Sequence, residues 1–350
     1  MEISTVATFR NEVIMDRLMS ESHYSESKNL EIKIIGVPDE LVTEMQEVIS
    51  SLVETISQKI DLTGLDGITF ASDYRQALLD LNRGYDTDHK LTASNDHGVG
   101  IAMSPRVMRD DKLKTHIVID AGMFFALLNA KRHDMAINTV AHECAHVELN
   151  HLYDVAFPGT LLRMKANVLD HFRSDCMLAC WDEFGACWRS ASFGPSSLLA
   201  YEAAFLPALE DTRPAANAAI MEYRTHGDIV LVMNKVCRLY GKLLKYSAYH
   251  LGNLHGHGID WRTVSTTVDA LQDHWFLPFF ERLDSCCKAI AADLDNWHNN
   301  ILFDALGDIA EDLVADGGMN FVRHEDDQIS LDIPMTVETM SVPPHLSRWS

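Results

Sequence analysis

The sequence predicts an α+β fold, in which a small sheet and a motif-bearing helix are followed by a mostly helical portion. Three observations favour this class. Short apolar runs alternate with helical patterns as far as Leu152, helical periodicity dominates from Pro158 to about Val314, and 47% of the residues are apolar. The 350 residues suffice for one large or two modest domains with a real core. Collagen-like, disordered and disulfide-scaffold classes are therefore excluded.

Residues 1–29 are polar and irregular, and we expect a loose N-terminal arm there. The front portion that follows contains strand and helix candidates in alternation: strand Leu30–Gly36, helix Leu41–Ile60, strand Leu65–Ala71, helix Asp73–Asn82, strands Gly98–Met103 and His116–Asp120, and helices Gly122–Lys131 and Asp134–Leu152. Pro38 stands where helices begin, and Gly84 can end the second helix. The segment Arg106–Lys114 is predicted as a turn.

The helical portion has four predicted breaks, at Gly194–Pro195, Gly227, Gly252–Gly258 and Pro278. A hairpin is expected in the tail, from Phe321–Arg323 and Ile329–Ile333. We therefore divide the chain into the arm, a core of residues 30–193 that carries the motif described next, a helical portion of residues 194–316 and an acidic tail of residues 317–350.

One motif stands out: His142-Glu143-Cys144-Ala145-His146, an HExxH pattern inside a predicted helix. Residues four apart lie on one helix face, so the two imidazoles can converge on one tetrahedral zinc ion. Glu143 lies beside them and can take a proton from a zinc-activated water and later pass it to a leaving amine. Such polar groups are costly in an apolar helix without a ligand, so we expect a zinc site rather than histidines satisfied within the helix.

A catalytic zinc ion takes three protein ligands, and Glu183 is the candidate for the third. Glu183 lies in the apolar segment Cys176–Trp188, whose only other charged residue is Asp182. A buried carboxylate needs a partner, and the alternative to zinc is a salt bridge to Arg163 or Arg189.

Other candidates for the third ligand fit less well. His171 and Asp175 are reserve ligands, because they lie on a more polar face of the same predicted helix as Glu183. His151 follows His146 by five residues, without the glycine of a metzincin-type spacing, and is expected at a helix end.

His142–His146 with a glutamate on a downstream helix resembles the gluzincin group of zinc metallopeptidases. The short strands that lead into the motif helix are similar to minimal gluzincins such as the ImmA/IrrE-like peptidases, and the resemblance covers about residues 65–190. It implies that His142, His146 and Glu183 bind Zn2+, that Glu143 is the general base, and that the reaction is hydrolysis of a peptide bond in an intracellular protein. Cys187 stands where many gluzincins have an aspartate that orients a histidine.

In this class of peptidase an edge strand pairs with an extended substrate. Gly98–Met103 is either that strand or an interior one. Asp182 is a candidate for orienting a ligand, and Tyr249, His250 and His255 are candidates for stabilising the oxyanion. For the last three, the alternative is an exposed loop between helices.

Charge and cysteine content bear on partners and compartment. The net charge of −22 argues against a general nucleic-acid binder, because phosphate neutralisation needs Lys and Arg. A basic stripe of Lys235, Arg238, Lys242 and Lys245 can dock an acidic partner or a nucleic-acid backbone, pair with the acidic tail or simply face solvent. No stretch approaches the roughly 18–20 apolar residues of a membrane helix. Seven cysteines, an odd number without a CxxC pair, favour reduced thiols and a cytoplasmic location.

The sequence therefore predicts a cytoplasmic zinc metallopeptidase that acts on a protein or peptide, and it indicates no oligomeric state. Two alternatives stay open: a non-catalytic interaction or regulatory protein that contains zinc, and a zinc hydrolase that acts on a non-peptide amide.

Overall fold

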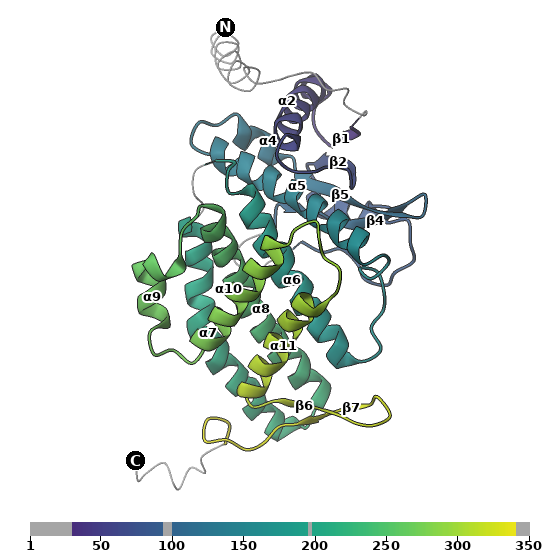
Figure 1. Ribbon diagram of the computed structural model, residues 1–350. Helices are drawn as coiled ribbons and strands as arrows, with labels where there is room; N and C mark the ends of the chain where they lie inside the picture. Colours follow the sequence, from purple (N-terminus) through teal and green to yellow (C-terminus); the bar gives the residue numbers. More distant parts are fainter. Residues whose placement is uncertain (1–29, 94–99, 195–197, 341–350) are drawn as a thin grey trace. The chain divides into compact units, whose positions relative to one another are not determined.

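The structure is a computed structural model, which describes residues 30–93, 100–194 and 198–340. It confirms the α+β class (Figure 1). The predicted N-terminal arm and the end of the tail, residues 341–350, lie outside the described residues. The chain divides into two compact units, Met1–Leu152 with Ser192–Pro195 and Tyr153–Ala191 with Ser196–Ser350, and each is described by itself.

The first unit contains a five-stranded mixed sheet. Its strands are β1 (Ile32–Ile35), β2 (Leu65–Ala71), β3 (Ala102–Met103), β4 (Arg106–Arg109) and β5 (Lys112–Asp120). Strands β1, β2 and β5 run parallel, and both β3 and β4 pair antiparallel with the outer side of β5. The central strands β2 and β5 are mostly buried, as expected for parallel strands covered on both faces.

Helices cover the two faces of this sheet: α2 (Asp39–Ser57), α3 (Tyr74–Asp80), α4 (Gly122–Leu127) and α5 (His133–Ala156). Tyr74 and Leu78 of α3 pack on Val118 of β5. Asn150 of α5 instead donates a hydrogen bond to the hydroxyl of Thr115. Since successive side chains of a strand point to opposite faces, α3 and α5 lie on opposite faces of β5. The motif helix is thus fixed against the sheet.

The predicted turn over Arg106–Lys114 is wrong, because most of this segment forms the hairpin of β4 and β5. Only Asp110 and Asp111 turn, and both have φ values in the left-handed region, 49° and 58°. Two consecutive residues with positive φ match the right-handed twist of a two-residue hairpin. The Asp pair was therefore a hairpin signal rather than the centre of a long loop. Of the predicted strand Gly98–Met103, Ala102–Met103 is a strand, and residues 98–99 lie outside the described residues.

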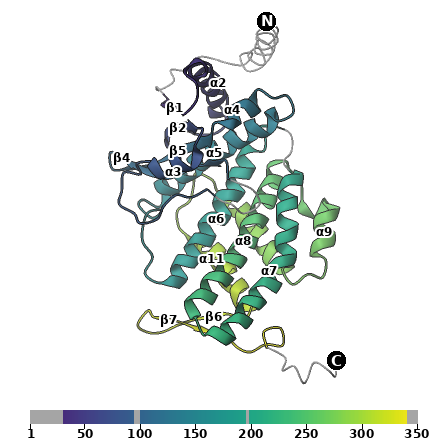
Figure 2. The ribbon, with the colours of Figure 1, turned by 180° about the vertical axis from the view of Figure 1, so that it is seen from behind.

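The second unit is a helical assembly with a terminal hairpin (Figure 2). Helices α6, α7 and α11 all contact α8, and α10 packs on α11. The elements are α6 (Val168–Ser190), α7 (Leu198–His226), α8 (Ile229–Gly256), the 3-10 turn Trp261–Thr263, α9 (Ser265–Leu271), α10 (Leu277–Ala292), α11 (Ile301–Asp316), β6 (Asn320–Arg323) and β7 (Ile329–Asp332). The predicted tail hairpin is confirmed, with Phe321 opposite Leu331.

Two predicted helix breaks have different outcomes. The chain does break at Gly227, which has a φ of 70° between α7 and α8. At Gly252–Gly258 the prediction is wrong in its first part, because α8 continues to Gly256. A Cβ added at Gly252 would lie 2.8 Å from the Cα of Phe184 on α6 and closer still to its carbonyl oxygen. Gly252 therefore allows α6 and α8 to approach closely and does not end the helix.

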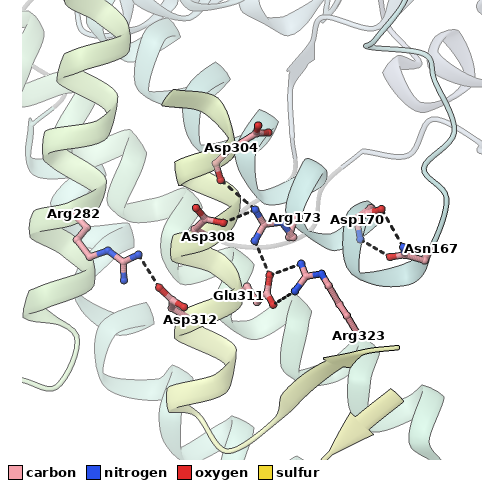
Figure 3. A network of polar contacts seen from close by, with 9 residues as sticks. All are labelled: Asn167, Asp170, Arg173, Arg282, Asp304, Asp308, Glu311, Asp312 and Arg323. Atoms are coloured by element: carbon pink, nitrogen blue, oxygen red, sulfur yellow. Dashed lines mark hydrogen bonds and ion pairs between the residues drawn. The ribbon is translucent and has the colours of Figure 1, made fainter. Parts of the chain in front are cut away.

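Ion pairs join the acidic helix α11 to its neighbours (Figure 3). Arg173 of α6 binds Asp308 at 2.5 Å and Glu311 at 2.6 Å, and Glu311 also binds Arg323 of β6 at 2.7 Å. Arg282 of α10 binds Asp312 at 2.7 Å. The acidic stretch is thus paired with arginines of α6, α10 and β6.

Candidate metal centre

The two motif histidines face each other on α5. Their Nε2 atoms are 3.1 Å apart, and the rings are nearly perpendicular. Both residues are buried, within a helix whose apolar residues Val140, Ala141 and Ala145 have no exposed surface. The spacing of four residues therefore brings the two imidazoles together, as the sequence predicts.

Glu143 is buried beside the histidines, and a residue next to strand β3 binds its carboxylate. The hydroxyl of Ser104, which follows β3, donates to Glu143 Oε2 at 2.7 Å and lies 3.1 Å from its backbone oxygen. Tyr74 of α3 is close enough for electrostatic coupling: burial raises the pKa of its phenol, and the Glu143 carboxylate raises it further. Glu143 thus has a fixed orientation.

Cys144, inside the motif, has no surface exposure. Burial raises the pKa of its thiol, so the sulfur stays protonated. This agrees with an inert thiol that packs in the core.

In the second unit, Glu183 is a buried residue of α6 that forms an ion pair with α8. Lys245 Nζ lies 2.8 Å from Glu183 Oε1, and this carboxylate raises the pKa of Lys245. The hydroxyl of Tyr249, one turn further on α8, bonds the same carboxylate, although burial is the main reason that the pKa of Tyr249 is raised. Asp182 adds to the negative charge near Lys245. The salt bridge considered from the sequence is present, with Lys245 as the partner rather than Arg163 or Arg189.

Among the described residues, one group of three has the ligand types and proximity needed to hold a metal ion. It consists of His142, His146 and Glu183, all buried, with one potential ligand atom from each within 4.8 Å of the others. Two imidazoles and a carboxylate are a common ligand set of open zinc sites. The predicted set of three is therefore the one that the structure brings together.

The other predicted site residues lie elsewhere. His171 and Asp175 pair with each other at 3.4 Å, with side chains 70% and 65% exposed, so a buried site does not include them. His250 stacks on Phe205 and bonds Thr267 at 2.9 Å. Burial lowers the pKa of His250 to about 4.

His255 stacks on Phe184, the residue that follows Glu183 in the sequence, and the two ring centroids are 5.5 Å apart. Burial lowers its pKa as well. Of the three residues considered for oxyanion stabilisation, Tyr249 bonds the predicted ligand Glu183.

Two residues of the site were not found from the sequence. Ser104 binds Glu143, and its only sequence signal is its position directly after an edge strand. Lys245 was placed in the basic stripe, together with Lys235, which binds Glu222 at 2.7 Å. The signal for Lys245 was its place one turn before Tyr249 on a helix of mixed burial. Lys235 and Lys245 of the stripe are thus both paired with carboxylates of the second unit.

Comparison with known proteins gives no match: no family model, no curated protein and no solved structure matches the chain. In the part of the chain that the structure describes, no helix is both long enough and apolar enough to cross a bilayer. A function for this chain is therefore inferred from the site itself.

Proposed function

We propose that this protein is a zinc-dependent metallopeptidase that hydrolyses a peptide bond in an intracellular protein. The observation that carries the proposal is the buried group His142, His146 and Glu183 with the oriented carboxylate of Glu143 next to it. A reactive carboxylate adjacent to a three-ligand site is the arrangement that metal-assisted hydrolysis requires. The seven cysteines are all free thiols, which supports a reducing compartment.

The residues fit zinc. Two Zn–N bonds of about 2.0–2.1 Å in a tetrahedron place their nitrogens about 3.3 Å apart, and the two Nε2 atoms are 3.1 Å apart. Two neutral imidazoles and one carboxylate leave a fourth position open. His142, His146 and Glu183 would hold the ion, which supplies Lewis acidity and lowers the pKa of water to about 7.

The residues of the chain supply the proton transfers. Glu143 accepts a proton from the attacking water and returns it to the leaving amine. Ser104 keeps the Glu143 carboxylate in one rotamer, which holds the base in position between these two steps. Within the second unit, Lys245 and Tyr249 orient the Glu183 carboxylate.

The edge of the sheet supplies a binding surface for an extended peptide. Among the described residues, β3 pairs with β5 alone, so its other side is available for main-chain pairing. Ser104 follows β3 directly, so a peptide added to this edge would pass the Glu143 carboxylate. We therefore assign β3, rather than an interior strand, to substrate binding.

A second candidate function is that of a non-catalytic interaction or regulatory protein. One observation favours it: the ion pair of Glu183 with Lys245 compensates the buried carboxylate without any metal. In such a protein the three residues would have a structural role, and Glu143 would have no substrate.

The variant Glu143→Gln distinguishes the two functions. Wild-type protein and variant, each loaded with zinc, are incubated with a proteome-derived peptide library, and new termini are identified by mass spectrometry. The peptidase proposal predicts one zinc per chain in both proteins, cleavage by the wild type, and a loss of activity of about 100-fold or more in the variant, since general-base catalysis contributes about 10²–10⁴. Equal cleavage by both proteins would refute the role of Glu143, and a zinc-loaded wild type that cleaves nothing would favour the non-catalytic function.

A further inference from the structure

Two arginines, Arg83 and Arg106, lie next to each other in the first unit. The backbone nitrogen of Met108 in β4 donates to the carbonyl of Arg83 at 2.7 Å, which ties the segment after α3 to the strand that begins with Arg106. Tyr85 lies between them: its ring is 4.6 Å from the Arg83 guanidinium, and its hydroxyl donates to the Arg106 carbonyl at 3.5 Å. Burial lowers the pKa of Arg83, and the charge of Arg106 lowers it further.

Neither guanidinium pairs with a carboxylate of the residues that the structure describes. Arg83 donates to the hydroxyl of Tyr85 and to the carbonyl of His89, and Arg106 Nε donates to Asn150 Oδ1 at 2.7 Å. By contrast, the nearby Arg109 makes two bonds to Asp66, of 2.9 and 3.0 Å. Two half-buried guanidinium groups in proximity repel each other, and their planar donor sets match a carboxylate or a phosphate.

The arginine pair lies beside the motif face of α5. Ser104 and Arg106 both contact this helix, the first at Glu143 and the second at Asn150. With about 100° of rotation per residue, Asn150 lies about 40° from His146 and about 20° from Glu143 around the helix axis. The chain from Ser104 to Arg106 therefore runs along the face that carries the metal ligands and the base.

We propose that Arg83 and Arg106 form a subsite for a carboxylate of the peptide substrate. This inference rests on the proposed metallopeptidase function and names a substrate class for it: peptides with an anionic group about two residues from the bond that faces Glu143. Two residues of extended chain span about 7 Å, which is also the greatest distance that the chain allows between positions 104 and 106. The carboxylate belongs to an Asp or Glu side chain or to the end of the substrate chain.

The test measures binding, so that it does not depend on cleavage. Full-length protein in the Glu143→Gln background, loaded with zinc, is titrated into three dansyl-labelled alanine-based hexapeptides, and fluorescence anisotropy is recorded. The first has one internal Glu and an amidated end, the second has Gln in its place and an amidated end, and the third has Gln and a free carboxylate. The first and third probes distinguish the two sources of the carboxylate.

We expect one of the two acidic peptides to bind at least about 10-fold more tightly than the neutral peptide, since a charge-assisted hydrogen bond is worth about that factor or more. Arg106→Gln and Arg83→Gln should each reduce this preference to about 2-fold or less. Arg132→Gln, which removes an exposed arginine of the same unit, should leave it unchanged. When the Glu is moved to other positions of the peptide, one position should give the tightest binding.

Preference is a ratio of two affinities measured on one preparation, so partial unfolding of a variant does not change it. A preference that persists in both Arg variants, or its absence from the parent protein, would overturn the subsite. A parent protein that prefers the acidic peptide, while the wild type cleaves no peptide, would support the subsite and refute the peptidase function.

Discussion

The close contact of α6 with α8 at Gly252 allows a quantitative test of how Glu183 is positioned. Gly252→Ala adds one methyl group that would lie 2.8 Å from the Cα of Phe184, the residue that follows Glu183. Ordinary van der Waals contact begins at about 3.4 Å. The position of the added Cβ is fixed by its own backbone and it meets backbone atoms of Phe184, so no side chain can rotate to relieve the clash, and the two helices must separate.

The expected cost follows from two opposing effects. Overpacking of a well-packed core costs about 1–3 kcal/mol. Alanine gains up to about 1 kcal/mol over glycine in a helix interior. A contact this short with backbone atoms puts the overpacking cost at about 2–3 kcal/mol. Gly252→Ala should therefore lower the free energy of unfolding by about 1–2 kcal/mol, and separation of the helices should also weaken zinc binding through Glu183.

Gly241→Ala is the matched control, because Gly241 also lies inside α8 and its added Cβ would meet a single side-chain atom, Sγ of Cys176, at 3.2 Å. That side chain can move, so this variant should be neutral or more stable by up to about 1 kcal/mol. Urea denaturation of the metal-free proteins measures both values, and zinc titration measures the second effect. Equal stability of the two variants would refute the close-approach argument.

Three further predictions concern the second unit and the ligand set. Glu183→Ala should strongly reduce the zinc content of the purified protein, as measured by mass spectrometry of metals. His171→Ala should leave the zinc content unchanged. A normal zinc content in Glu183→Ala would contradict the assignment of Glu183 as a ligand. His250, whose pKa is lowered by burial to about 4, stays neutral in the folded state while the unfolded chain takes up a proton near pH 6.5. Stability is therefore lost as the pH falls from about 6.5 towards 4, by about 3 kcal/mol at most, and denaturation at pH 7 and 4.5 should show a smaller loss for His250→Gln. Arg173 lies at the centre of the network in Figure 3, and Arg173→Gln should lower the free energy of unfolding by about 1–2 kcal/mol. Arg282→Gln breaks an exposed pair and should lower it by less than about 1 kcal/mol. Equal values from urea denaturation would refute a special role for the Arg173 network.

The sequence predicts the elements with strong periodicity well and their ends less well. Helix α5 and strand β2 were found because apolar residues recur at helical spacing in the first and form a continuous run in the second. The hairpin of β4 and β5 was missed because the charged residues Arg106, Arg109 and Lys112 give this segment the composition of a polar loop. Gly252 was taken as a helix break because sequence alone does not show that another backbone approaches it.

The residues of the candidate site also differ in whether the sequence predicts them. His142, Glu143 and His146 follow from local spacing on one helix, which a sequence pattern records directly. Ser104 and Lys245 contact the site from other elements, so only the tertiary arrangement identifies them. Glu183 was found because a carboxylate in an otherwise apolar helix segment is itself a signal of a buried partner.

The most direct test of the zinc site is anomalous scattering from crystals of the protein grown with zinc, with data collected above and below the zinc absorption edge. The proposed zinc site predicts one strong anomalous peak at about 2.0–2.2 Å from Nε2 of His142, Nε2 of His146 and a carboxylate oxygen of Glu183. A map without a peak among these three residues, with Glu183 bonded to Lys245 alone, would contradict it.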